Sequence, residues 1–212
     1  MNRFRRWAAF ILILDVIGAG GWLVWQFDLR WRPHIIARDQ AQIAGVLQGA
    51  GWVSPHLAGP KVYVIAHEDC TGCAGLISTE LPKLEAAGVE TRVIMIALAD
   101  KNGQAKSTPA ERSTVAELWV NRDWKLFQRW MAATPPRAWT APGVPTADGD
   151  AARTAVLQSG RAAADQLRPL LGHNGVRFDY PLLIWWNKAG VMHACLCRDP
   201  RAYRPVEKEL GA

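Results

Sequence analysis

The stretch "KVYVIAHEDCTGCAGL", residues 61–76, joins an apolar run to two closely spaced cysteines. Its first six residues are mostly β-branched, aromatic or small, which favours a buried strand. Cys70 and Cys73 follow, with two residues between them. A C-x-x-C pair is a redox dithiol, half of a zinc site, or a pair of small core residues, so its meaning depends on the rest of the chain.

The N-terminus predicts export from the cytoplasm. Residues 1–6, "MNRFRR", form a basic tip with three arginines, and residues 7–25 are apolar and nearly uncharged. A helix over 7–25 would cross roughly 28 Å of hydrocarbon. Positive residues before such a run place the tip in the cytoplasm. We therefore expect a single-pass anchor in a bacterial inner membrane, with the catalytic domain in the periplasm.

The same segment admits a second interpretation, a secretion signal. Residues 7–17 would then be its apolar core, and "GAGG" (18–21) its small-residue cleavage region. Under either interpretation the chain beyond residue 30 lies outside the cytoplasm, where disulfides persist. This compartment favours a redox dithiol over a zinc site.

Composition limits the function classes. The chain has 212 residues, a formal net charge of +6 and a hydrophobic content of 50%, which suits one packed domain with appendages. The arginines are scattered, and no dense basic stripe alternates with aromatic residues. Nucleic acid is therefore not an expected partner.

The pattern after residue 60 predicts a βαβ unit. Strand 61–66 is followed by a predicted helix over 70–87, in which Pro82 introduces a kink. A second buried strand is predicted at 90–98. Two strands joined by a helix at this spacing form a parallel pair with a right-handed crossover.

The rest of the chain completes the predicted fold. Residues 26–55 are expected to form a juxtamembrane linker and a short helix, and residues 56–212 one domain. A helical insert covers about 107–172, beginning with the capping-box pattern "TPAE". The runs "PLLIWWN" and "VMHACLC" predict a hairpin, followed by a last helix at 199–210. The order predicts an α/β, thioredoxin-like fold with a helical insertion between the second and third core strands.

The position of the cysteines suits thiol chemistry. At a helix start, unpaired N–H groups and the helix dipole lower the pKa of Cys70, which would attack a disulfide. Cys73, one turn later, would resolve the mixed disulfide. Two neighbours, Glu68 and Asp69, would raise the thiol pKa, and His67 would offset them if it is protonated.

A second landmark is "DYPLLIWW", in which Pro181 opens an apolar strand. Proline is tolerated at a strand start, and a cis peptide bond there is a deliberate feature. In a thioredoxin-like arrangement this proline faces the dithiol and shapes the substrate groove. We therefore predict a cis bond between Tyr180 and Pro181.

Three stretches resemble the catalytic domain of the periplasmic disulfide isomerases DsbC and DsbG: "VYVIAHEDCTGCAGL", "ELWVNRDWKLFQRWM" and "GVRFDYPLLIWWNKAG". The resemblance covers roughly residues 50–210. It implies that Cys70 is the nucleophile and Cys73 the resolving thiol, and that Tyr180 and Pro181 form the cis-proline loop.

The chain also departs from that family. The spacer Thr71-Gly72, which would line the substrate groove, replaces an aromatic-containing pair, and the dimerisation domain of that family has no counterpart before the first strand. The resemblance then implies a membrane-tethered enzyme.

A second cysteine pair lies in "MHACLC". Cys195 and Cys197 alternate along the predicted strand with their side chains on one face, which His193 shares. Three interpretations stay open: buried thiols, a second disulfide or redox relay, and a metal site of His193, Cys195 and Cys197, with copper(I) favoured by the soft ligands.

The sequence as a whole predicts a membrane-anchored periplasmic thiol–disulfide oxidoreductase that reduces or isomerises disulfides. Its expected partners are disulfide-containing exported proteins and a membrane redox recycling partner, and no cofactor is expected. One alternative is a redox-inert binding subunit of a membrane or secretion assembly. Another is a copper-handling protein that uses the second cysteine pair.

Overall fold

The computed structural model describes residues 14–15, 17–23, 25–26, 31–133 and 138–212. The chain divides into two compact units, residues 1–32 and 33–212. In the first unit the described residues between 14 and 26 are helical. Much of the predicted anchor at 7–25, namely 7–13, 16 and 24, lies outside the described residues. The described helices include none that is both long and apolar enough to span a bilayer.

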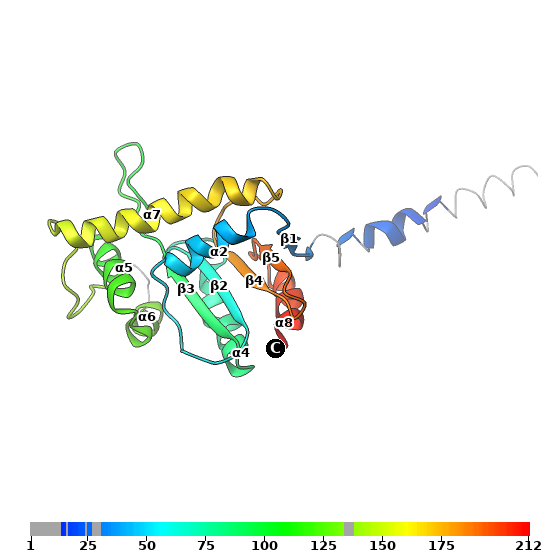
Figure 1. Ribbon diagram of the computed structural model, residues 1–212, viewed down its shortest axis with the longest axis horizontal. Helices are drawn as coiled ribbons and strands as arrows, with labels where there is room; N and C mark the ends of the chain where they lie inside the picture. The colour runs from blue at the N-terminus through cyan, green and yellow to red at the C-terminus, as the bar shows by residue number, and fades with distance from the viewer. Residues whose placement is uncertain (1–13, 16, 24, 27–30, 134–137) are drawn as a thin grey trace, which may run out of the picture. The chain divides into compact units, whose positions relative to one another are not determined.

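Within the described residues the second unit is built on a mixed sheet of five strands in the order β1-β5-β4-β2-β3 (Figure 1). Strands β2 and β3 are parallel, whereas β4 pairs antiparallel with both β2 and β5. The predicted βαβ unit and the predicted hairpin are therefore confirmed. The strand bounds are β1 His34–Ile35, β2 Lys61–Ala66, β3 Glu90–Met95, β4 Leu182–Trp186 and β5 Met192–Cys195.

Helices cover both faces of this sheet. In Figure 1, α2 and α7 lie on one face and α4 and α8 on the other. The helical segments are α2 Gln40–Gly49, α3 Cys73–Gly75, the π-helical η2 Leu76–Glu80, α4 Leu81–Ala86, α5 Pro109–Asn121, α6 Trp124–Met131, α7 Ala151–Gly172, the 3-10 turn η4 Pro200–Ala202 and α8 Tyr203–Leu210. Because α5, α6 and α7 lie between β3 and β4, the fold is thioredoxin-like with the predicted helical insertion.

The segment predicted as a linker and a short helix contains that helix, α2, and from residue 33 onward it belongs to the second unit. His34 and Ile35 pair with β5, and α2 contributes Ile43 and Leu47 to the buried core over β4 and β5. A strand of two residues is too short to show a periodicity, which explains why the sequence did not predict it. Residues 33–55 thus cover the sheet instead of merely connecting it to an anchor.

The predicted helix over 70–87 is shorter and has a break. It begins at Cys73, after Gly72 with φ of 91°, so Cys70 precedes the helix and does not cap it. Within it, the N–H of Leu81 bonds to the carbonyl of Leu76, five residues back, in place of the usual four. Pro82 has no N–H to give an α-helical bond, so the widened turn directly before it accommodates the ring.

Trp119 of α5 fixes the insert to the rest of the domain. Its indole Nε1 donates to the carbonyl of Met95 at the end of β3, at 2.8 Å. Two glycines let neighbouring segments approach its ring: Gly160, inside α7, and Gly51, just after α2. The long helix α7 runs through Gly160 without a break.

Replacing Gly51 with alanine should destabilise the domain. The new Cβ would lie 2.4 Å from the Trp119 ring, so one of the two must move, at a cost of about 1–3 kcal/mol. Gly49→Ala is the matched control, because its Cβ meets no described atom within 4 Å. Denaturant unfolding should show a lower midpoint for Gly51→Ala alone. Equal midpoints for the two variants would show that Trp119 is not packed as described.

Candidate dithiol site

Cys70 and Cys73 are joined by a disulfide, with their Cα atoms 5.3 Å apart. The chain leaves β2 at Ala66 and turns through a bond from the Cys73 N–H to the Cys70 carbonyl, at 3.0 Å. Cys70 is 8% exposed and Cys73 1%. Both cysteines are therefore buried, and Cys70 is the more exposed residue of the two.

The spacer between the cysteines is shaped by a distant segment. Thr71 is exposed, and Gly72 is half-buried. A Cβ on Gly72 would lie 3.2 Å from the Cα of Arg198. The guanidinium of Arg198 in turn donates from Nε to the carbonyl of Tyr180, at 3.1 Å, and pairs with Asp179. Arg198 thus links the cysteine turn to the loop before β4.

That loop contains the predicted cis peptide bond, between Tyr180 and Pro181. Pro181 is buried at the start of β4. The ring of Tyr180 meets His67 edge-on, with the ring centroids 5.0 Å apart. Burial raises the pKa of Tyr180 to about 12, so its phenol stays neutral. The structure therefore brings His67, three residues before Cys70, into direct contact with the loop that contains Pro181.

His67 does not supply a positive charge that would offset Glu68 and Asp69. Burial lowers the pKa of its imidazole, and the opposing attraction of Asp69 and Asp179 does not reverse this. At neutral pH the ring is therefore uncharged. The neutral ring of His67 packs against Tyr180 and does not compensate the negative charges of nearby carboxylates.

Glu68, the acidic residue two positions before Cys70, contacts the helical insert. Glu68 accepts a bond from the indole Nε1 of Trp130 in α6, at 2.9 Å. Its charge also acts on the carboxyl of Glu111, which is 4% exposed at the start of α5. Burial raises the pKa of Glu111 to about 8, and the charge of Glu68 acts in the same direction. Two carboxyl groups thus share a protected site beside the cysteine turn.

Sequence reasoning missed this contact. Glu111 was recognised as part of a capping box, and the structure confirms that box: its side chain accepts from the N–H of Thr108. The capping role alone accounts for a glutamate at position 111. The sequence pattern therefore did not indicate that Glu111 lies near Glu68, which is more than forty residues away in the chain. The other predicted modulator, Asp69, is exposed.

The second cysteine pair also forms a disulfide, between Cys195 at the end of β5 and Cys197, with Cα atoms 5.2 Å apart. Cys197 is fully buried, and its carbonyl accepts from the hydroxyl of Tyr203. The next residue is Arg198, which touches the spacer of the first pair. The second disulfide therefore holds the segment that lies over the dithiol turn.

The alternative metal site is not formed in this structure. Both sulfurs are bonded to each other, and Nδ1 of His193 lies 3.2 Å from a carboxylate oxygen of Glu209 in α8. Across residues 31–133 and 138–212 no group of three or more ligating side chains is placed to hold a metal ion. The soft-ligand cluster suggested by "MHACLC" is thus replaced by a disulfide and a histidine–carboxylate contact.

Replacing Glu111 with glutamine should weaken the pH dependence of stability. Folding raises the pKa of the Glu111 carboxyl from 4.5 to about 8. Between these two pH values the carboxyl keeps its proton in the native state and loses it in the unfolded chain. Native stability therefore falls as the pH rises from 5 to 8, by up to about 1.4 kcal/mol for each pH unit.

Glutamine keeps the cap without titrating. Unfolding midpoints at pH 5, 6.5 and 8 should show a shallower decline for Glu111→Gln than for the wild type, with the variant the more stable protein at pH 8. A decline of equal slope in both proteins would contradict the raised pKa.

Comparison with known proteins supports the fold. No family model matches the chain, and no curated protein matches it by sequence. Among solved structures, a linker-deletion mutant of Proteus mirabilis ScsC aligns over 97% of this chain and 95% of its own, with a TM-score of 0.53 and 11% identity. A compact conformation of Proteus mirabilis ScsC aligns over 94% and 90%, with a TM-score of 0.51 and 11% identity. At this identity the similarity is one of fold, and it agrees with the thioredoxin-like topology described above.

Proposed function

We propose that the chain is a thiol–disulfide oxidoreductase that acts through Cys70 and Cys73. The observation that carries the proposal is the position of this pair. It lies between β2 and the helical segment 73–86, and Cys70 is the more exposed of the two residues. The loop with the cis bond before Pro181 lies beside it, linked through His67 and Arg198.

In the reducing direction the chemistry has two steps. The Cys70 thiolate attacks one sulfur of a client disulfide; a bond forms between Cys70 and that sulfur, and the other client sulfur leaves as a thiolate and takes a proton from water. Cys73 then loses its proton and attacks Sγ of Cys70, which releases the second client sulfur. Two electrons pass to the client, and the Cys70–Cys73 disulfide is formed.

In the isomerising direction a different client thiol attacks the mixed disulfide. This returns Cys70 to the thiolate and leaves a new client disulfide, with no net transfer of electrons. The positive end of the helical segment 73–86 favours the thiolate of Cys70, whereas Glu68 and Asp69 oppose it. The resemblance to DsbC and DsbG supports a reductase or isomerase of this type.

We propose that the enzyme works in the periplasm, anchored through residues 7–25 in the inner membrane. The support is the basic tip and the apolar run in the sequence. Its clients would be exported proteins that contain disulfides, and a membrane redox protein would recycle the dithiol. The two disulfides suit such an oxidising compartment.

Replacing Cys73 with alanine should trap clients. Without the resolving thiol the mixed disulfide on Cys70 persists. Cys73→Ala should therefore migrate on a non-reducing gel as adducts with client proteins, and treatment of the sample with a reductant should remove these adducts. The Cys70→Ala/Cys73→Ala variant is the matched control, and it should carry none. No trapped client on Cys73→Ala, together with failure of the wild type to react with glutathione disulfide, would favour a redox-inert binding subunit instead.

A further inference from the structure

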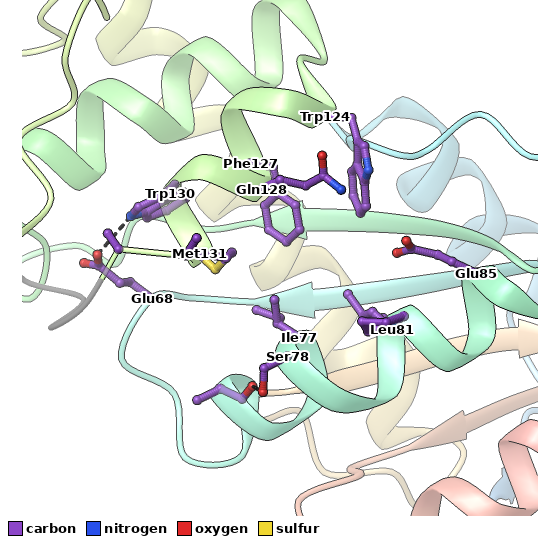
Figure 2. A pocket seen from close by; sticks show the side chains of 14 residues that line it. Glu68, Ile77, Ser78, Leu81, Glu85, Trp124, Phe127, Gln128, Trp130 and Met131 are labelled. Atoms are coloured by element: carbon purple, nitrogen blue, oxygen red, sulfur yellow. Dashed lines mark hydrogen bonds between the residues drawn. The ribbon is translucent and has the colours of Figure 1, made fainter.

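A groove lies between α6 of the insert and the helical segment that follows the dithiol (Figure 2). We call it the α6 groove. It encloses about 500 Å³, within the size range of binding pockets. One wall carries Ile77 and Leu81, and the other Trp124, Phe127 and Met131. The thiol chemistry described above does not use it.

The groove adjoins the dithiol at one end. Glu68, two residues before Cys70, lines it, and so does Ala74, the residue directly after Cys73. A polypeptide whose own cysteine is bonded to Cys70 would therefore pass the opening of the groove within a few residues. This adjacency favours an extended chain as the occupant over a small molecule.

The aromatic wall is already in place. The rings of Trp124 and Phe127 stack with their centroids 4.9 Å apart, and Trp130 is held by its bond to Glu68. Preformed aromatic surfaces bind at a low entropic cost. Met131 adds a flexible, polarisable side chain, which is typical of surfaces that accept varied apolar partners.

The two ends of the groove are acidic. Figure 2 shows Glu68 at one end and Glu85 at the other. Glu85 is half-buried on α4 and accepts a bond from the hydroxyl of Thr91. The described lining residues include no lysine or arginine. A basic residue at the end of an apolar segment would complement Glu85.

We propose that the α6 groove binds an extended segment of the client polypeptide, in which large apolar side chains follow the reactive cysteine and a lysine or arginine comes next. The apolar side chains would lie against Ile77 and Trp124, and the basic one near Glu85. The inference rests on the proposed oxidoreductase function and adds a substrate preference to it: clients are selected by apolar sequence beside the disulfide.

The test compares disulfide substrates of the full chain in its reduced form. The probe is a short peptide with one cysteine in a mixed disulfide with glutathione, followed by Phe, Leu and Lys. Reaction gives the oxidised protein, the free peptide thiol and glutathione. A matched peptide has Ser in place of Phe and Leu, and glutathione disulfide serves as the substrate without a peptide. The apolar peptide should react at least about tenfold faster than the Ser peptide.

Substitutions of groove residues test whether the preference for the apolar peptide arises from the groove. Trp124→Ala should lower the ratio of the apolar-peptide rate to the glutathione-disulfide rate about tenfold, and Trp124→Phe should retain most of it. Glu85→Gln should remove a preference of about threefold for Lys over Glu in the peptide. Val120→Ser is the matched control, because Val120 is an exposed apolar residue of α5 outside the groove. It should change no ratio.

A second readout is independent of thiol chemistry. Fluorine NMR of the oxidised full chain labelled with 5-fluorotryptophan should show shifts at Trp124 and Trp130 on addition of the same peptide with Ser in place of Cys. The signal of Trp185, which bonds to Glu209 of α8, should stay constant.

The outcomes separate the two proposals. If glutathione disulfide reacts but the peptides show no preference and no shifts, the groove proposal is wrong and the oxidoreductase stands. If glutathione disulfide does not react, the oxidoreductase proposal is wrong, and the NMR signals alone decide whether the groove binds peptide. Shifts caused by menadione, a small apolar ligand, but not by the peptide would make the groove a small-molecule site and overturn the proposal.

Discussion

The antiparallel pairing of β2 with β4 is the constraint on which the site depends. Ile65 lies opposite Leu182, and continuing this register by one residue sets Pro181 opposite Ala66. The cysteine turn begins just after Ala66, so the proline loop and the dithiol meet because of this register. A slip of one residue would turn every side chain of β4 to the other face. The long insert between β3 and β4 leaves that pairing intact.

The insert nevertheless takes part in the site. Trp130 of α6 donates to Glu68, two residues before Cys70, and the charge of Glu68 acts on the buried carboxyl of Glu111 in α5. The same helix α6 forms one wall of the apolar groove beside the dithiol. At its other side the insert is fixed to the end of β3 through Trp119. The cysteine turn is thus embedded between the sheet and the insert, and a neutral His67 leaves its charge environment acidic.

Much of this architecture follows from local sequence patterns. The apolar runs at 61–66 and 181–187 each predicted a strand, and the capping box at Thr108 predicted the start of α5; the structure contains all three. Other features depend on contacts between distant segments and leave no local pattern. These are the short strand β1, the Glu68–Glu111 pair and the α6 groove. The start of the helix at Cys73 rests on the conformation of Gly72, which a C-x-x-C pattern does not specify.

The central claim is that Cys70 and Cys73 form a reversible dithiol. The most direct measurement equilibrates the full chain in glutathione buffers of graded ratio, quenches with acid, alkylates free thiols and determines the state of the pair by mass spectrometry. We expect the pair to change continuously and reversibly from disulfide to dithiol as the ratio of reduced to oxidised glutathione rises. A pair that keeps one state at every ratio would contradict it.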